Sequence, residues 1–411
     1  MPTRTLPSPS ALARHWDLAS DVVYLNHGSF GACPREVMAA QSAWRRRMEE
    51  EPVRFFIDEL EGALDRSRTA IGGLVGCAPR DLAPVANATT GVATVLANIE
   101  LGAGDEVIAT RHEYPACLHN LERAVERAGA RIVYSEMPFP VAGAWEIVER
   151  VLACVTERTR AALVSHITSS TAMVLPLAEI VRELRERGIE TIVDGAHGPG
   201  QVDVDLEAIG AAWYTANCHK WPCAPKGAAF LHVRADKQAG FRPLVLSNHA
   251  HSARSDRSKF LIEFDYVGTD DRTAFLSVAD SIACVCGMHD EGWAGVMATN
   301  HELLLRARDQ LCERLGTPAP VPGAMLGSMA TILLPAHPAG LAERLAARPT
   351  KHHDALQDEL MSRHSIEVPI WSVPGTSTRF TRISAQLYNS FEQYVYLADA
   401  LVEELERERR M

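Results

Sequence analysis

The chain has few of the features that mark membrane, secreted or nucleic-acid-binding proteins. No long apolar run occurs, and residues 1–20 contain Pro, Arg, His and Asp, so neither a membrane span nor a secretory signal is expected. The nine cysteines include no CxxC spacing, which favours reduced thiols over a disulfide framework. The net charge of −11 argues against general binding to nucleic acid or anionic membranes. We therefore expect a cytoplasmic protein.

Two common ligand motifs are also missing. The glycines of Gly195–Gly200 lack the GxGxxG order, so no dinucleotide fingerprint is present. His249 and His251 have no matching cluster of cysteine, histidine or carboxylate, so no metal site is expected.

What the chain does contain is an alternation of short apolar runs and helical patterns from about residue 80. Helices are predicted at Leu118–Ala128 and Leu177–Arg187, each stopped by a glycine. Strands are predicted at Val107–Thr110, Arg131–Tyr134, Ala161–His166, Thr191–Asp194, Trp213–Thr215 and Ala228–Val233. This order predicts an α/β fold with a mainly parallel sheet between two helical layers. Ligands of such sheets bind at the carboxyl ends of the strands.

At 411 residues the chain is too long for one typical domain. We predict a large three-layer domain at 41–288 and a smaller α+β domain at 289–411. The segment 1–40, which is punctuated by proline and glycine, is predicted to lie across the junction and to belong with the smaller domain.

Three residues at or after predicted strand ends suit pyridoxal 5'-phosphate (PLP). Lys220 supplies an amine that forms an imine, and Lys226 is a weaker competitor. Asp194 supplies an anion for the pyridine nitrogen, although an aspartate after a strand is also a common helix cap. His197 is placed to hydrogen-bond near the imine and the phenolic oxygen, and a core histidine is the alternative.

A phosphate site is predicted where Asn87–Gly91 opens a helix. Free N–H groups at a helix N-terminus attract an anion, and Thr89 and Thr90 add hydroxyl donors. Asn217 and His219 are expected to reach the same phosphate. The alternative is that the asparagine and threonines of Asn87–Gly91 are ordinary helix caps.

Five further residues are candidates for contacts with the cofactor ring or the substrate. Tyr114 is predicted to stack on the pyridine face and Ser169 to hydrogen-bond the phenolic oxygen. Arg382 is the candidate for a substrate carboxylate, which a guanidinium matches with two hydrogen bonds. Asn26 and His27 are expected to line the same pocket, with a plain turn as the alternative.

In combination these motifs resemble the class V aminotransferase family of fold-type I PLP enzymes, in particular its isopenicillin N epimerase-like members. The motifs follow the family's order over about residues 25–390. They are Leu25–Gly31, Asn87–Thr90, His112–Pro115, Asp194–His197, Asn217–Trp221, Ala224–Gly227, Arg382–Ser384 and Tyr388–Asn389.

The resemblance implies PLP as the cofactor and a small amino-acid substrate whose α-carboxylate meets Arg382. It also implies the imine at Lys220, the pairing of Asp194 with the pyridinium, and stacking by Tyr114. A homodimer with a shared active site is implied, in which Gly268 and Thr269 reach the phosphate of the neighbouring subunit.

Several reactions begin with removal of the Cα proton by Lys220. Epimerisation or racemisation is favoured by the resemblance, and β-elimination by a C–S lyase is the alternative because it needs only one base and a leaving group. Aminotransfer and β- or γ-replacement are ranked after these two reactions, and a non-catalytic binding module is ranked last.

Cysteine desulfurases of this class carry a mobile cysteine upstream of the arginine that binds the carboxylate. Here the last cysteine is Cys312, and none lies between it and Arg382, so persulfide chemistry is disfavoured.

Overall fold

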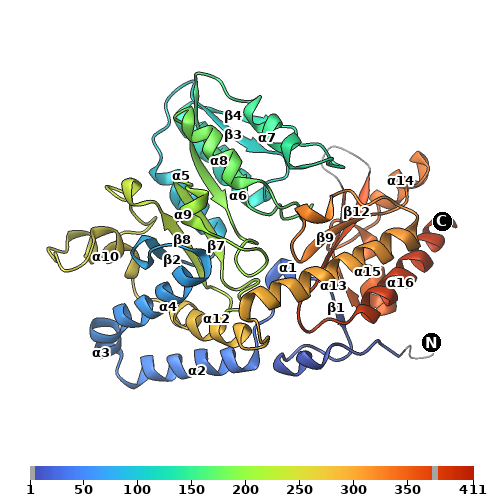
Figure 1. Cartoon of the computed structure of the whole chain (residues 1–411), viewed down its shortest axis with the longest axis horizontal. Helices are drawn as coiled ribbons and strands as arrows, with labels where there is room; N and C mark the ends of the chain where they lie inside the picture. Colours follow the sequence, from blue (N-terminus) through green and yellow to red (C-terminus); the bar gives the residue numbers. More distant parts are fainter. Residues whose placement is uncertain (1–4, 373–377) are drawn as a thin grey trace.

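The computed structural model describes residues 5–372 and 378–411. At its centre is a seven-stranded sheet in the order β2-β8-β7-β6-β5-β3-β4 (Figure 1). Its strands are β2 (Leu82–Val85), β3 (Glu106–Thr110), β4 (Arg131–Ser135), β5 (Thr159–Ser165), β6 (Glu190–Asp194), β7 (Trp213–Asn217) and β8 (Ala229–Val233). Neighbours from β7 through β6, β5 and β3 to β4 are parallel, and β8 runs antiparallel to both β7 and β2.

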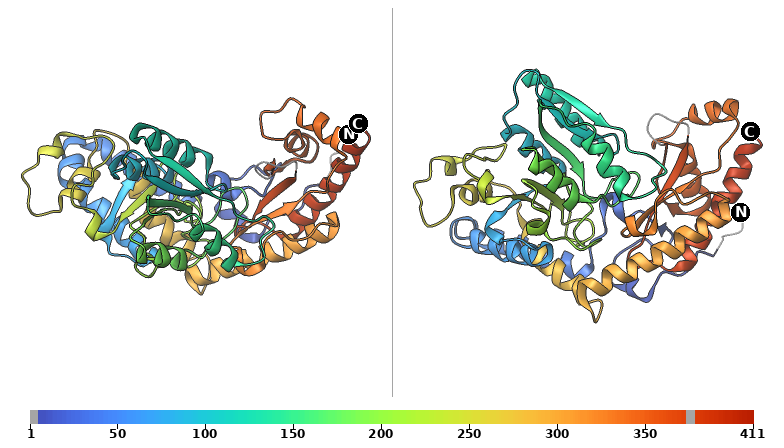
Figure 2. Two further views of the ribbon diagram at one scale, coloured as in Figure 1. Left: turned by 90° about the horizontal axis from the view of Figure 1, so that it is seen from above. Right: turned by 45° about the horizontal axis from the view of Figure 1, so that its top comes forward.

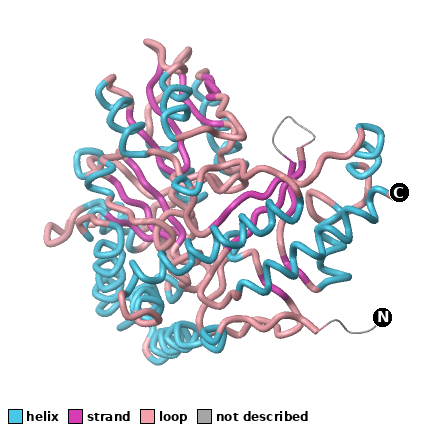
Figure 3. The backbone as a smooth tube through the Cα atoms, turned by 45° about the vertical axis from the view of Figure 1, so that its right-hand side comes forward, coloured by secondary structure: helices cyan, strands magenta, loops and turns pink. Residues whose placement is uncertain are grey.

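Helices cover both faces of this sheet, as the tube view shows (Figure 3). In β5, Ala161 and Leu163 enter the core that contains α5 and α6, whereas Ala162 and Val164 enter the core that contains α7 and α8. This alternation follows from the two-residue period of a strand, and apolar residues on both faces require cover on both sides. The helices around the sheet are α4 (Leu60–Val75), α5 (Ala88–Asn98), α6 (Pro115–Ala128), α7 (Ala144–Leu152), α8 (Leu177–Glu186), α9 (Leu206–Ile209), α10 (Lys259–Asp265), α11 (Thr273–Leu276) and α12 (Val278–Cys286).

The C-terminal part lies to one side of the large sheet (Figure 2). It contains the antiparallel sheet β11-β12-β9, formed by β9 (Met329–Leu333), β11 (Ile370–Ser372) and β12 (Arg379–Ser384). Its helices are α13 (Gly292–Leu315), α14 (Ala339–Ala346), α15 (Ala355–His364) and α16 (Phe391–Arg409). The helices α13 and α16 pack against each other, and α13 also packs against β9.

The N-terminal segment contacts both parts. Its elements are the 3-10 helix η1 (Ala11–His15), β1 (Val23–Tyr24), α1 (His27–Phe30), α2 (Arg35–Glu50), α3 (Pro52–Arg54) and the π-helix η2 (Phe55–Glu59). β1 pairs in parallel with β10 (Ile366–Glu367) of the C-terminal part, while α2 packs against α11 and α12. The predicted boundaries after residues 40 and 288 stay predictions.

The predicted α/β fold is confirmed, and so are the elements expected around the site. All six predicted strands occur within two residues of their expected ends. Gly129 and Gly188, which end the two predicted helices, have the left-handed φ values of 68° and 75° that suit glycine. The strand β2 was not predicted. It contains Pro84, and a proline is tolerated here because β2 is an edge strand. None of the helices in the described part of the chain combines the length and apolar character that crossing a bilayer requires.

Candidate active site

A cavity of about 470 Å³ opens at the carboxyl ends of β5, β6 and β7. Parallel strands deliver their C-terminal residues to one edge of a sheet, and α5 points its N-terminus at the same place. Arg382 from β12 and Trp371 from β11 close the side that faces the C-terminal part. The predicted residues that line the cavity are Thr89, Tyr114, Ser169, Asp194, His197, Asn217, His219, Lys220 and Arg382.

Lys220 lies in the turn that follows β7, and its amine reaches the cavity. Lys220 Nζ is 2.9 Å from Nε2 of His197. Burial of the amine and the nearby charge of Arg382 lower the pKa of Lys220 to about 7. Burial and the Lys220 charge hold the pKa of His197 well below its ordinary value. The competitor Lys226 does not line the cavity, and its Nζ donates to the carbonyl of Gly31 at 3.1 Å.

Asp194 ends β6 and is held by two donors. Its Oδ1 accepts the N–H of Ala196 at 3.0 Å, and its Oδ2 accepts the thiol of Cys117 at 3.2 Å. Burial and the Asp194 charge raise the pKa of Cys117, so the thiol remains a donor. A carboxylate that is 4% exposed and positioned in this way suits a protonated ring nitrogen.

The N-terminus of α5 has one open donor facing the cavity. Asn217 Oδ1 accepts the N–H of Ala88 at 2.9 Å, and Asn87 Oδ1 accepts the N–H of Thr90 at 2.8 Å. The N–H of Thr89 lies between these two and has no hydrogen-bond partner among the described residues. His219 Nδ1 donates to the carbonyl of Ala228 at 3.0 Å, so its Nε2 donates to a phosphate only when the ring is protonated, a form that a bound anion favours. These groups fit the phosphate of PLP.

Arg382 is 1% exposed and stacks on Trp371, with its Cζ 4.9 Å from the ring centroid. One of its nitrogens donates to the carbonyl of Ser169, and another donates to Asn26 Oδ1 at 3.2 Å and to Ser29 Oγ at 3.1 Å. Burial lowers the pKa of Arg382 to about 10, so the guanidinium stays charged at neutral pH. Its Nε is buried without a partner in the described chain. A fixed cation on the cavity wall fits an incoming carboxylate.

Three residues that were expected at the cavity do not line it. His27 is fully buried and faces the backbone of Lys220 instead of the cavity. The hydroxyl of Thr90 donates to Asn87 Oδ1 at 3.0 Å, because Thr90 takes part in the helix cap and does not reach the cavity. Asn26 contacts Arg382 and does not itself line the cavity.

Gly268 and Thr269 also lie outside this cavity, in the loop between α10 and α11. Thr269 Oγ1 is within 2.9 Å of the hydroxyl of Tyr266. Their predicted contact with the phosphate of a neighbouring subunit stays a prediction, as do the chemical roles of the lining residues.

Sequence reasoning missed several residues around the cavity. Trp371 and His353 line it from the C-terminal part, and no sequence motif marks either one. Ser165 ends β5 opposite Asp194, so the rule that ligands meet strand ends could have identified it. Glu113 accepts hydrogen bonds from Ser165 and from Thr110, the latter at 2.6 Å. Burial raises the pKa of Glu113 to about 7.

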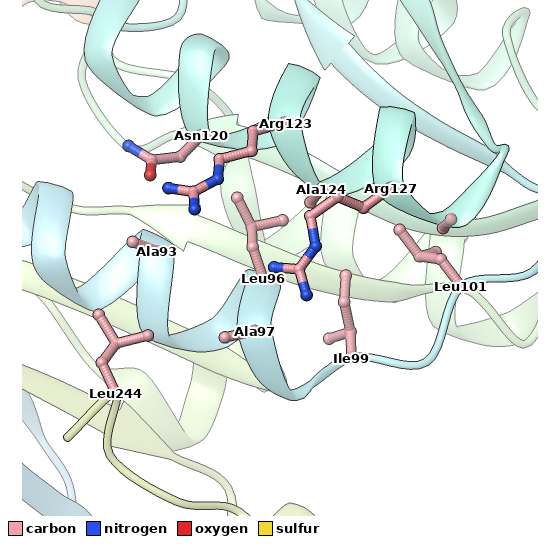
Figure 4. A pocket seen from close by; sticks show the side chains of 11 residues that line it. Ala93, Leu96, Ala97, Ile99, Leu101, Asn120, Arg123, Ala124, Arg127 and Leu244 are labelled. Atoms are coloured by element: carbon pink, nitrogen blue, oxygen red, sulfur yellow. The ribbon is translucent and has the colours of Figure 1, made fainter.

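A cluster of metal-ligand residue types and a second hollow lie elsewhere. Within the described residues, His364, Glu403 and Glu404 could hold an ion by geometry, but arginine already pairs there: Arg407 is 2.6 Å from Glu403. The second hollow, of about 540 Å³, lies between α5 and α6 under Arg123 and Arg127 (Figure 4). It contains none of the predicted site residues.

Comparison with known proteins identifies the family of this chain. The model of the family described as aminotransferase class-V matches residues 23–264, which carry Asp194 and Lys220. The chain belongs to the class V aminotransferases. Members of this family are PLP-dependent enzymes, which confirms the predicted cofactor and the prediction of an enzyme.

Class V relatives of two kinds match nearly the whole chain. A probable chloroplastic L-cysteine desulfhydrase of Arabidopsis thaliana is 33% identical over 93% of this chain and 82% of its own length. The isopenicillin N epimerase of Streptomyces clavuligerus is 31% identical over 92% of this chain and 94% of its own length. A solved complex of the cystine C–S lyase C-DES has a TM-score of 0.76 and 18% identity, covering 93% of this chain and 98% of that one. This last similarity supports the fold.

Proposed function

We propose that this class V enzyme cleaves the C–S bond of a small amino acid such as cysteine by β-elimination. The observation that carries the proposal is the hydrogen bond between Lys220 Nζ and His197 Nε2, 2.9 Å long, at the cavity. Burial lowers the pKa of Lys220 to about 7, so the neutral amine is accessible near neutral pH. It is therefore available as the base that β-elimination requires.

Three side chains of the cavity have separate roles in this proposed reaction. PLP, when bound, withdraws electrons from the substrate Cα and so acidifies its hydrogen. Asp194 holds a proton on the ring nitrogen, Lys220 takes the proton from Cα, and Arg382 holds the carboxylate. Departure of the β-sulfur then gives, for cysteine and one water molecule, sulfide, pyruvate and ammonia.

The charge of the cavity wall supports a small substrate with one carboxylate. Among the described lining residues, Arg382 is the one guanidinium and Lys220 the one amine. A substrate with a second carboxylate would need a second cation, because burying an unpaired charge is costly. The curated relatives named cysteine desulfhydrase support the same substrate class.

The cysteines of this chain support direct release of sulfide. None of the described cysteines lines the cavity, and Cys117 is engaged as a donor to Asp194. A persulfide-forming desulfurase needs a cysteine thiolate at the substrate sulfur. β-Elimination needs no such group.

Epimerisation is the second candidate, because the epimerase of Streptomyces clavuligerus matches this chain over 94% of its own length. It requires an acid that returns a proton to the other face of Cα. The phenol of Tyr114, which lines the cavity and is 44% exposed, is the group that we would test in this role.

Incubation with L-cysteine in heavy water separates the two reactions. We expect sulfide and pyruvate in equal amounts, and about 10²–10⁴-fold slower formation of both with Lys220→Ala. D-cysteine carrying deuterium at Cα, without sulfide, would contradict the lyase proposal and support the epimerase. Loss of D-cysteine formation in Tyr114→Phe would then assign the second acid.

We also propose a homodimer with a shared site. Phe30 (74% exposed) and Tyr114 (44% exposed) are large side chains at the cavity, and exposed apolar surface of this kind marks interfaces. Gly268 and Thr269 do not reach the cavity of their own chain, which leaves them available to a neighbour. Sedimentation should give twice the mass of one chain. When the Lys220→Ala and Thr269→Ala proteins are mixed, the activity should differ from that of the separate proteins only if each site contains residues of both chains.

A further inference from the structure

We infer that His27 is a positioning residue that holds the backbone of Lys220, and that Tyr388 orients His27. The inference rests on the proposed role of Lys220. His27 Nε2 lies 3.0 Å from the carbonyl oxygen of Lys220, and His27 Nδ1 lies 2.9 Å from the hydroxyl of Tyr388. One imidazole thus joins the N-terminal segment, the turn that carries the cavity amine, and the C-terminal part.

The chemistry of these contacts determines the tautomer of His27. A carbonyl oxygen only accepts, so Nε2 must carry the proton that it donates to Lys220. Burial lowers the pKa of His27 to about 3, so the ring is neutral and Nδ1 is an acceptor. The hydroxyl of Tyr388 is then the donor to Nδ1. Burial raises the pKa of Tyr388 well above its ordinary value, which keeps that hydroxyl protonated.

Packing holds the imidazole in place from the other sides. The His27 ring lies 4.9 Å from the ring of Trp221, the residue that follows Lys220. His27 is 0% exposed and Tyr388 is 1% exposed, so water cannot replace either hydrogen bond without opening the core.

The chain after His27 is also pressed against the Lys220 turn. Gly31 has a φ of 69°, and a Cβ on it would lie 2.1 Å from the carbonyl oxygen of His219. Lys226 donates to the carbonyl of Gly31 at 3.1 Å. Residues 27–31 therefore contact the turn at both ends, and the hydrogen bond from His27 fixes the residue whose side chain enters the cavity.

The location of these bonds predicts their effect. If the backbone at Lys220 were free to rotate, Lys220 Nζ would move away from His197 Nε2, and the burial of both nitrogens would change. We therefore expect loss of the His27 bond to shift the proton affinity of the Lys220 amine, in addition to any loss of stability.

Two matched variants separate the two hydrogen bonds of His27. His27→Gln places an amide N–H near the position of Nε2 and keeps the donor to Lys220, but it offers nothing at Nδ1. His27→Asn places an amide oxygen near the position of Nδ1 and keeps the acceptor for Tyr388, but it cannot reach Lys220. Tyr388→Phe removes only the hydroxyl.

The test measures Lys220 directly in the full-length protein without cofactor. The pH midpoint for acetylation of Lys220 by acetic anhydride is followed by peptide mass analysis, and the thermal midpoint of each variant confirms folding. We expect His27→Gln to shift the midpoint only slightly, about as much as Tyr388→Phe, because both variants lose only the bond between His27 and Tyr388. We expect His27→Asn to shift it and to weaken PLP binding about tenfold, the effect of one buried hydrogen bond. Tyr388→Phe should shift the midpoint in the same direction and by less.

The results that would overturn the inference differ from those that would overturn the proposed function. If folded His27→Asn keeps the wild-type midpoint and PLP affinity, or if His27→Gln is damaged as much as His27→Asn, His27 does not act through the Lys220 backbone. If wild-type protein forms no sulfide from cysteine but the midpoints behave as expected, the lyase proposal fails and the positioning role stands.

Discussion

Lys220 Nζ lies 2.9 Å from His197 Nε2 at the carboxyl end of the large sheet. The two nitrogens come from turns after neighbouring strands, β7 and β6. When Lys220 donates, Nε2 accepts, and the proton of the neutral imidazole is on Nδ1, a buried atom without a partner among the described residues. The pair therefore holds a weakly basic amine at the cavity and leaves one donor next to it.

Replacement of Lys220 by alanine is expected to remove the visible absorption of bound PLP and to lower the rate by about 10²–10⁴-fold, the typical contribution of a general base. Absorption spectra and sulfide release measure the two effects. Lys237→Ala is the matched control, because Lys237 pairs with Glu190 at 2.7 Å, at the opposite end of β6. Retention of the visible band in Lys220→Ala would assign the cofactor amine elsewhere.

The lowered pKa of Lys220 predicts a dependence of stability on pH in the cofactor-free protein. The folded pKa is about 7 and the ordinary value is 10.5, so between them the unfolded chain binds a proton that the folded chain does not. The free energy of unfolding should therefore rise with pH across this window, and the contribution is lost as pH falls through about 7. Urea unfolding of wild type and Lys220→Met should show the difference: the variant gains less stability between about pH 7 and pH 10. If the free energies of unfolding of the two proteins change with pH in parallel, folding does not lower the pKa of Lys220.

Arg382 should govern recognition of the substrate carboxylate. Arg382→Lys keeps the charge but loses the planar fork and the stacking on Trp371, so we expect KM to rise about 10- to 100-fold with a smaller change in kcat. Binding of cysteamine, which lacks a carboxylate, provides the control. Its spectral dissociation constant should differ little between wild type and the variant. An equal loss for both ligands would indicate general damage to the cavity.

Gly91 is expected to tolerate no side chain. A Cβ there would lie 2.0 Å from Thr215 Oγ1, because α5 crosses β7 closely just behind the phosphate site. Gly91→Ala should cost about 1–3 kcal/mol of unfolding free energy and should weaken PLP binding. Gly73→Ala in α4 meets nothing within 4 Å and should stabilise the protein by about 0.5–1 kcal/mol. Urea unfolding of both variants compares the two sites. An unchanged Gly91→Ala would mean that α5 can move away from β7.

The sequence predicted the central part of the site because local chemistry determines it. Asp194 and Lys220 follow short apolar runs that become β6 and β7, and parallel strands must present such residues at one edge. The cap at Asn87 follows from hydrogen bonding within four residues, which is why the N-terminus of α5 could be expected.

The outer wall of the cavity could not be predicted in the same way. Trp371 and His353 reach it only because the sheet of β9, β11 and β12 docks beside the large sheet, and no short-range pattern encodes that docking. The sequence also could not decide between Lys220 and Lys226 as the cofactor lysine. In the structure the amine of Lys220 enters the cavity, whereas the amine of Lys226 donates to the carbonyl of Gly31.

By itself the sequence determined the order of strands and helices, the residues at the strand ends and, through collinear motifs, the family and its cofactor. These depend on periodicity and on neighbours along the chain. Only the tertiary structure decided that His27 binds the backbone of Lys220, that Thr90 belongs to a cap and that Asn26 acts on Arg382. The physical reason is that a polar side chain takes the partner that the fold places within about 3 Å, and that partner can lie hundreds of residues away.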